Sequence, residues 1–366
     1  MSELREVIAT DAPYYVMLGG LIIGFVFGVF VVRTNFCTMG AISDFMNFGD
    51  FRRFRAWLLA SATAIVGAQL LAYEGVLPIS KTMYVGSSLN WFGHIFGGLL
   101  FGFGMVFAGG CVSKNLARFG GGDLRSLMNL AVIGIFAYMT IGGVLGPVRA
   151  SIEEATRVSV TGFGDTQSLA SFAARATGMD APLMGLVVGF GIAGLIAMYC
   201  FSDASFRRSP IHIVSGLSIG LCVVAGWALT GLAYDEFAEV PMVPMSLSYV
   251  RPAGDSLEWL QRYTALGLPN FGVASLFGAT IGAFLATALK GSFKFTSYSD
   301  ANDTVRNLMG SSMMGVGGVM ALGCTVGQAI TGVSTLALGS FLTFAAIVIG
   351  GMVGMKVFER ALMAEA

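Results

Sequence analysis

The sequence predicts an all-α polytopic membrane protein with about nine transmembrane helices, short re-entrant helices and an inverted internal repeat. Three observations predict this fold class. Apolar residues make up 55% of the 366 residues, charged residues make up only 11%, and the mean hydropathy is +0.77, which together exclude an ordinary soluble protein. Long apolar runs recur along the chain, and two of them end in a Gly-Cys step. The 51 glycines lie within such runs, where small residues let membrane helices pack closely.

A helix that crosses a bilayer needs roughly 20 mostly apolar residues. Eight runs satisfy this requirement, at residues 14–32, 56–72, 91–109, 127–145, 182–201, 210–232, 271–289 and 336–355. A ninth run, Leu308–Leu322, is shorter and is interrupted by glycines. The N-terminal segment lacks the basic region of a cleavable signal, so the first run is expected to direct insertion. Residues 1–366 are predicted to form a single membrane domain surrounded by the lipid bilayer.

The distribution of charge predicts the orientation. With nine spans and an external N-terminus, 14 of the 21 basic residues fall on one side of the membrane and 7 on the other. The second side also carries both long loops, residues 146–181 and 233–270. The positive-inside rule then places the C-terminus in the cytoplasm. Because 21 basic residues balance 21 acidic ones, no net charge indicates a nucleic-acid partner.

An internal repeat is suggested by matches at a constant offset of 213 residues. The matching sets are Gly97, Gly102, Gly104, Ala108, Gly110 and Cys111 against Gly310, Gly315, Gly317, Ala321, Gly323 and Cys324. In addition, residues 20–24 (GLIIG) resemble residues 216–220 (GLSIG). Spans one and three thus pair with spans six and eight, and a separation of five spans inverts the orientation. The predicted repeats are residues 14–150 and 210–358, on either side of a central helix at 182–201. Chance matching among abundant glycines is the alternative.

The chain after each Gly-Cys step is too short and too polar to cross a membrane. These segments, residues 111–122 and 324–334, are predicted to be re-entrant helices that begin at Cys111 and Cys324, with Gly110 and Gly323 at the helix breaks. Free N–H groups at a helix N-terminus favour an anion. The hydroxyl of Ser113 or of Thr325 would add a further donor. The alternative is that each step is a simple kink with a small buried cysteine.

The five cysteines are an odd number and contain no CxxC motif, which argues against a disulfide framework and a zinc site. No metal or other cofactor is expected. Cys37 follows the first span in a polar, glycine-containing break, and the sequence leaves open whether it faces the same path as Cys111 and Cys324. Cys200 and Cys222 lie within apolar runs and are interpreted as packing residues.

Few ionisable residues fall inside the predicted spans. His94 and His212 each lie near the start of a span, where an interfacial position is expected, and Gln69 and Asn129 are the polar amides deep within spans. Lys114 and Arg118, four residues apart after Cys111, share one face of the short helix and could attract an anion. The alternative for these two cations is an ordinary basic flank of the membrane.

At these motifs the chain resembles the YeeE/YedE family of sulfur-transport membrane proteins. The resemblance rests on residues 33–44 (RTNFCTMGAISD), residues 109–111 (GGC) and residues 323–327 (GCTVG). It implies a nine-span inverted-repeat bundle in which Cys37, Cys111 and Cys324 lie on one pathway for thiosulfate. The implied mechanism is a relay of neutral thiols that hydrogen-bond the sulfur of the anion. A cytosolic sulfur-carrier partner of the TusA type is also implied. The sequence departs from the family at Lys114, where smaller residues are frequent.

The leading functional hypothesis is therefore an inner-membrane transporter that imports a sulfur-containing anion, most directly thiosulfate. Two hypotheses from other classes remain open. One is a membrane-embedded sulfurtransferase or redox protein that carries persulfide on a cysteine, and the other is a structural membrane scaffold. A related sulfur or selenium species is the alternative substrate.

Overall fold

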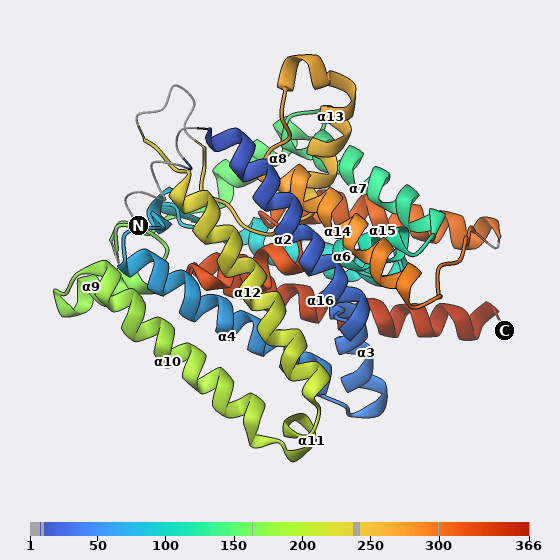
Figure 1. The fold of residues 1–366 in the computed structure, drawn as a ribbon, viewed down its shortest axis with the longest axis horizontal. Coiled ribbons are helices and arrows are strands. Elements are labelled where there is room, and N and C mark those ends of the chain that lie inside the picture. The colour runs from blue at the N-terminus through green and yellow to red at the C-terminus, as the bar shows by residue number, and fades with distance from the viewer. Residues whose placement is uncertain (1–7, 9–10, 163, 237–241, 299, 366) are drawn as a thin grey trace.

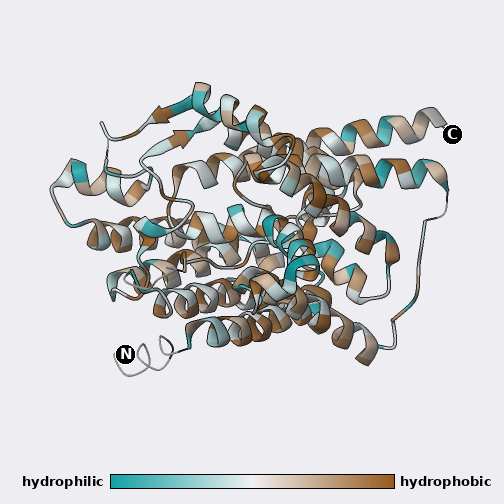
Figure 2. Ribbon diagram, turned by 90° about the horizontal axis from the view of Figure 1, so that it is seen from above, coloured by the Kyte–Doolittle hydropathy of each residue, from teal (hydrophilic) through white to brown (hydrophobic). Residues whose placement is uncertain are grey.

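The computed structural model describes residues 8, 11–162, 164–236, 242–298 and 300–365. Within these residues, eight helical segments have the length and composition to cross a membrane, and they coincide with the eight predicted runs. They are Ala12–Phe48, Arg52–Tyr73, Gly93–Gly120, Leu124–Ile141, Ala181–Ser202, Pro210–Leu232, Phe271–Leu289 and Leu338–Ala361. Figure 2 shows apolar residues along most of the bundle helices. The external placement predicted for the N-terminus concerns residues outside the described part of the chain.

Two of these segments, Ala12–Phe48 and Gly93–Gly120, consist of more than one helix. In the first half the elements are α2 (Ala12–Thr34), α3 (Thr38–Phe48), α4 (Arg52–Tyr73), η1 (Ile79–Lys81), β1 (Ser88–Asn90), η2 (Gly93–Gly97), α5 (Gly98–Phe107), α6 (Val112–Gly120), α7 (Leu124–Ile141), α8 (Gly146–Thr156), β2 (Arg157–Ser159) and α9 (Leu169–Thr177). The remaining elements are α10 (Ala181–Ser202), α11 (Ala204–Arg207), α12 (Pro210–Leu232), α13 (Val250–Leu266), α14 (Phe271–Leu289), α15 (Ala301–Met320), η3 (Gly327–Gly332) and α16 (Leu338–Glu365).

The long loops are more structured than the sequence indicated. Residues 146–181 contain α8 and α9, and residues 233–270 contain α13. The strand β2 pairs with β1 in an antiparallel ribbon, in which Leu89 lies opposite Val158. The prediction of an all-α protein therefore holds except for this ribbon. The apolar runs gave no indication of it, because three residues per strand are too few for an alternating pattern to be recognised.

The ninth predicted run is part of α15, a helix of 20 residues. It begins well before the predicted Leu308, because Asp300 caps its first turn by accepting from the backbone N–H of Asp303. Its first two turns are polar, so α15 is not among the eight helices that are apolar enough to span. It packs against α5 and α7 inside the bundle (Figure 1).

Glycines determine how closely the helices approach. Helix α2 packs along α14, and a side chain at Gly24 would collide with the backbone oxygen of Ser275. In return, a side chain at Gly278 would collide with the backbone oxygen of Leu21. Such direct backbone contact between helices is the usual role of small residues in membrane bundles.

Glycines also make mutual close contacts between η2 and α5 on one side and α15 on the other. A Cβ atom at Gly97 would lie 2.7 Å from the carbonyl oxygen of Gly317, and one at Gly104 would lie 2.6 Å from that of Gly310. The converse contacts, from Gly317 to Gly97 and from Gly310 to Gly104, are equally close at 2.6 Å. These four glycines are members of the matched sets at an offset of 213 residues.

Candidate substrate pathway

Three cysteines lie at the N-termini of short helical segments. Cys37 is the N-cap of α3, and its thiol accepts a hydrogen bond from the backbone N–H of Gly40 at 3.4 Å. Cys111 is the N-cap of α6. Cys324 immediately precedes the helical segment that contains η3, and its thiol accepts from the N–H of Gly327 at 3.3 Å. The predicted positions of Cys111 and Cys324 agree with the structure, and Cys37 proves to have the same local role.

The chain breaks before two of these cysteines, as the Gly-Cys steps predicted. In the first break Gly109 has φ +67° and Gly110 has φ +147°, a conformation that only glycine adopts readily. In the second break the left-handed residue is Leu322, with φ +59°, whereas Gly323 has no positive φ. Gly323 therefore does not supply the unusual backbone conformation that its position suggested.

The three thiols are buried and lie together. The side chain of Cys111 interacts with that of Cys37, and Cys324 lies near it. Its sulfur lies 3.2 Å from the hydroxyl of Ser113. The buried Thr325 hydroxyl, from the other broken segment, also approaches the Cys111 thiol and makes no other hydrogen bond among the described residues. The structure thus groups the predicted residues around Cys111 as the central thiol.

Two buried amides hold the broken backbone in place. Asn115 donates from Nδ2 to the carbonyl oxygens of Gly110 at 2.9 Å and of Cys111 at 3.2 Å. Gln328 donates from Nε2 to the carbonyl oxygen of Ala321. Helix ends leave carbonyl groups unpaired, and these amides satisfy them inside the bundle. Sequence reasoning missed both residues, although they are separated by the same 213 positions as the cysteines.

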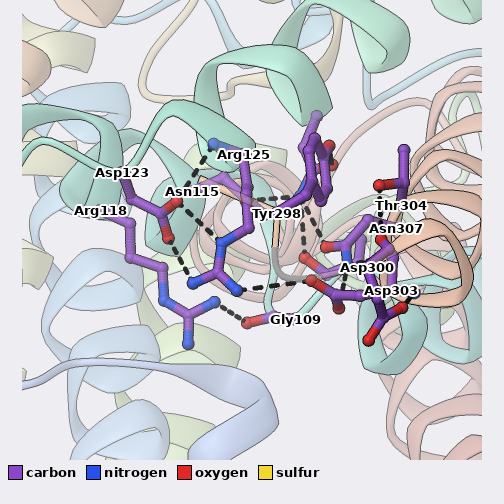
Figure 3. Close-up of polar contacts among 12 residues, drawn as sticks. Gly109, Asn115, Arg118, Asp123, Arg125, Tyr298, Asp300, Asp303, Thr304 and Asn307 are labelled. Carbon is purple, nitrogen blue, oxygen red and sulfur yellow. Dashed lines mark hydrogen bonds and ion pairs between the residues drawn. The ribbon is translucent and has the colours of Figure 1, made fainter. Parts of the chain in front are cut away.

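Asn129, which the sequence marked only as a polar residue within a span, takes part with Asn115 in the hydrogen bonds around the first helix break. It donates from Nδ2 to the carbonyl oxygen of Ala108 at 3.1 Å and to Oδ1 of both Asn115 and Asn307. Figure 3 shows Asn115 and Asn307 among the polar side chains that surround this helix break. The amide network joins α6, α7 and α15 around the end of α5.

A cavity of about 200 Å³ reaches the second break. It is lined by Leu322 and Gly323 and by the hydroxyl residues Tyr84 and Ser248. The Ser248 hydroxyl interacts with both Tyr84 and Cys324. Burial raises the pKa of Tyr84 well above its ordinary value, so this phenol is neutral. Sequence reasoning also missed these two residues, which lie in irregular segments between the spans.

A second cavity, of about 160 Å³, reaches the first break at Gly109. Its lining is more charged and includes Arg118 and an ion-paired group in which Arg125 contacts Asp123 at 3.1 Å and Asp303 at 3.6 Å (Figure 3). Arg118 donates to the carbonyl oxygen of Gly109 at 2.6 Å. Each helix break is therefore next to a cavity with charged side chains in its lining, which at the second break are Arg149, Arg251 and Asp255.

Lys114 projects from α6 near the Cys37 and Cys111 thiols. Its ammonium group donates to Oδ1 of Asn35 at 2.7 Å. Asn35 adopts the left-handed conformation at the end of α2, with φ +52°, which asparagine tolerates better than most residues. The lysine singled out by its departure from the family motif thus lies close to the thiols.

Cys200, Cys222 and Gln69, which were also noted in the sequence, are held by packing or by hydrogen bonds. Cys200 donates its thiol to the carbonyl oxygen of Arg55 at 3.4 Å, and Cys222 is buried in the apolar core, in agreement with packing roles. Gln69 donates to the carbonyl oxygen of Ser334 at 2.8 Å. His212 is partly exposed at the start of α12.

His94 differs from the expectation of an interfacial side chain. It is 3% exposed, and its Nδ1 lies 2.8 Å from the Thr343 hydroxyl. The glycine at position 339 leaves the space that the imidazole ring fills. The position of His94 near the start of a span did not indicate that its side chain is buried, because this burial depends on the packing of α16. Within the described residues, no group of three or more His, Cys, Asp or Glu side chains has the arrangement of a metal site.

Helix breaks enclosed in a bundle of membrane-length helices, each next to a cavity, are the architecture of a membrane transport protein. Comparison with family models gives a more specific assignment, because a model described as "Sulphur transport" matches residues 33–353. The chain belongs to this family.

Two relatives match most of the chain. A protein named thiosulfate transporter TsuA from Spirochaeta thermophila is 28% identical over 345 residues, which cover 90% of this chain and 96% of the relative. The protein of the same name from Escherichia coli is 26% identical over 340 residues, which cover 87% of each chain. A third relative, the probable transporter YedE of Escherichia coli, is 33% identical over 91 residues, or 25% of this chain and 21% of its own.

Proposed function

We propose that this protein imports thiosulfate across the bacterial inner membrane along a pathway that contains Cys37, Cys111 and Cys324. The observation that carries the proposal is the position of Cys111, whose thiol interacts with Cys37 and lies near Cys324. Membership of the sulphur transport family and similarity to two proteins named thiosulfate transporters support the substrate class.

The chemistry of the grouped side chains suits such an anion. A neutral thiol is a weak hydrogen-bond donor, and several weak sites in series allow an ion both to bind and to leave. The buried Thr325 hydroxyl lies beside the Cys111 thiol and has no other hydrogen-bond partner among the described residues, so it supplies a donor to an anion bound at that thiol. Ser113, 3.2 Å from the central sulfur, supplies a second hydroxyl. The anion passes these groups without a covalent intermediate.

The helix packing supports the proposed inverted repeat of residues 14–150 and 210–358 about the helix at 182–201. Helix α2 packs on α14 and α4 packs on α12, while α5 packs on α16 and α15 packs on α7. If the two halves are related, a contact between a helix of the first half and a helix of the second is expected to recur between their counterparts. The reciprocal glycine contacts between α5 and α15 follow the same rule, because a twofold axis makes contacts self-complementary.

In the proposed arrangement α15 is the ninth span, and the segments after Cys111 and Cys324 are re-entrant helices. The N-terminus lies outside and the C-terminus lies in the cytoplasm, as the 14 basic residues on that side favour. A cytosolic sulfur-carrier protein of the TusA type remains the proposed partner on the inner face. This partner rests on the family resemblance alone.

The test is uptake of ³⁵S-thiosulfate into proteoliposomes that contain the purified protein. We expect Cys111→Ala and Cys324→Ala to abolish uptake and Cys37→Ala to reduce it strongly. Cys200→Ala and Cys222→Ala are matched controls, because both replace a buried thiol that lies outside the proposed pathway. Chromatographic profile and thermal unfolding confirm that each variant is folded.

Full uptake by all three pathway variants would refute the relay and favour a scaffold role. A persulfide on Cys111 or Cys324 after turnover, detected by mass spectrometry, would favour the sulfurtransferase alternative. Preferential uptake of a selenium anion would change the substrate but keep the pathway.

A further inference from the structure

Three basic side chains from two helices lie beside the Cys37–Cys111 thiol pair. They are Arg53 of α4 and Lys114 and Arg118 of α6, which we call the basic cluster. Lys114 lies within electrostatic range of both thiols and of both arginines. Arg149 and Arg251 line the cavity at the second break, but they are paired with Glu153 at 2.7 Å and with Asp255 at 3.6 Å.

Lys114 is partly buried and has no carboxylate partner among the described residues. Its hydrogen bond to Asn35 uses one of the three N–H donors of an ammonium group. A cation withdrawn from water is costly unless it is paired, and within a membrane protein such a residue usually marks an ion pathway. Two donors and a full positive charge are thus available next to the thiols.

Arg53 is held close to Cys37 by the absence of a side chain at Gly40. A Cβ atom at that glycine would collide with the guanidinium group of Arg53, so the guanidinium lies directly on the first turn of α3. Arg53 pairs with Asp44 at 3.3 Å. Cys37 caps this same turn.

Arg118 completes the cluster on the other side of Lys114. It donates to the carbonyl oxygen of Gly109, and the neighbouring Asp123 is already engaged by Arg125 at 3.1 Å. Within the basic cluster, three cations are therefore opposed by one paired carboxylate, Asp44. The adjacent group of Arg125 with Asp123 and Asp303 adds one net negative charge beside Arg118, so the cluster keeps an excess of positive charge that favours an anion.

We propose that the basic cluster is an anion-binding site for divalent oxyanions, with Lys114 as its central ligand. The proposal rests on the proposed function and specifies how the substrate is oriented. The sulfonate oxygens of thiosulfate accept charge-assisted hydrogen bonds from Lys114 and Arg53, while its terminal sulfur faces Cys37 and Cys111. Sulfate, which lacks that sulfur, binds to the same cations without engaging the thiols.

The experiment measures equilibrium binding of ³⁵S-sulfate and ³⁵S-thiosulfate to the purified protein in detergent. We expect Lys114→Met to raise the Kd for both anions at least about ten-fold, since it removes a charged hydrogen-bond donor. Lys114→Arg keeps the charge and should stay within about three-fold of the unchanged protein. Lys290→Met is the matched control, because Lys290 is exposed at the end of α14 and lies outside the cluster.

A second arm separates this site from the thiol pathway. In a Cys37→Ala, Cys111→Ala double variant, sulfate should bind as it does to the unchanged protein, and adding Lys114→Met should remove that binding. Failure of the proposed function would appear as uptake that is independent of the cysteines. Failure of the anion site would appear as equal sulfate binding with and without Lys114, or as no sulfate binding by the unchanged protein.

Discussion

The two helix breaks have the same plan but different surroundings. Each follows a glycine-rich helix, each ends at a cysteine, and in each an amide 213 positions from its counterpart satisfies the freed carbonyl groups. The first break is next to Lys114 and Arg118. The second is surrounded by hydroxyl and amide groups and by a cavity whose two arginines, Arg149 and Arg251, are paired with carboxylates. The shared plan holds the thiols in place, and the differences determine which part of an anion each break can bind.

The second break is also the more deeply enclosed. Thr331 donates to the carbonyl oxygen of Leu247 at 2.7 Å, and Trp227 donates to the Ser334 hydroxyl at 2.9 Å. Thr331 of η3 and Ser334, two residues after η3, are both 0% exposed. The first break has a cavity lined by arginines and carboxylates at its margin. The two breaks therefore differ in that Lys114 beside the first has no carboxylate partner among the described residues, whereas the arginines near the second are ion-paired.

The largest effect is expected from the backbone of the first break. Gly110→Ala places a side chain at φ +147° and at 3.0 Å from Lys114 Cγ, whereas Gly323→Ala meets nothing closer than 3.3 Å at an ordinary φ. We expect Gly110→Ala to destabilise the fold by about 1–3 kcal/mol and to abolish uptake, and Gly323→Ala to have a much smaller effect. Thermal unfolding in detergent and proteoliposome uptake measure the two consequences.

Gly178→Ala is the control for this comparison. Gly178 is also left-handed, with φ +72°, but a Cβ atom there would meet nothing within 4 Å. It should lower stability without affecting uptake. Equal loss of uptake in Gly110→Ala and Gly323→Ala would contradict the assignment of the strained backbone to the first break alone.

An intermediate effect is expected from the two amides. Asn115→Ala leaves the Gly110 carbonyl without its side-chain donor and also removes an acceptor of Asn129, whereas Gln328→Ala leaves only the Ala321 carbonyl without its donor. An unsatisfied buried polar group costs roughly 1–3 kcal/mol, so Asn115→Ala should lower the unfolding midpoint more than Gln328→Ala. The reverse order would mean that enclosure, rather than the amide network, stabilises the breaks.

Much of the fold followed from the sequence, because a membrane-spanning helix requires a long apolar run whatever its neighbours are. The eight clear runs correspond to eight helices. The breaks at Cys111 and Cys324 were also predicted, since glycine before a polar segment interrupts such a run. The left-handed Leu322 was not predicted, because leucine rarely adopts this conformation and only the surrounding packing selects it.

Residues of the site were predictable from the sequence where the side chain is chemically distinctive, as the thiol of cysteine is. Cys37 could not be assigned by symmetry, because its counterpart at an offset of 196 residues is Ala233. Ser248, which precedes the Tyr249 N-cap of α13 and interacts with Cys324, has no marker in the sequence that distinguishes it from other serines of the irregular segments.

The smallest effect should come from the rim of the charged cavity, at Asp123. This residue caps α7, and although burial alone would raise its pKa, the hydrogen bonds and charge of Arg125 hold that pKa below its ordinary value. A carboxyl group whose pKa is lower in the folded state stabilises the protein above its unfolded pKa of about 3.9, and that stability is lost as the pH falls through the folded pKa.

Asp123→Asn should therefore cost at most about 1 kcal/mol at pH 7, because asparagine still caps the helix, and it should weaken the dependence of the unfolding midpoint on pH below about 4. Uptake at neutral pH should be nearly unchanged, because the carboxylate pairs with Arg125 and lies outside the basic cluster. A large gain in sulfate affinity in this variant would show that Asp123 competes with the anion for Arg118. Asp123 would then belong functionally to the basic cluster and not only to the ion-paired group around Arg125.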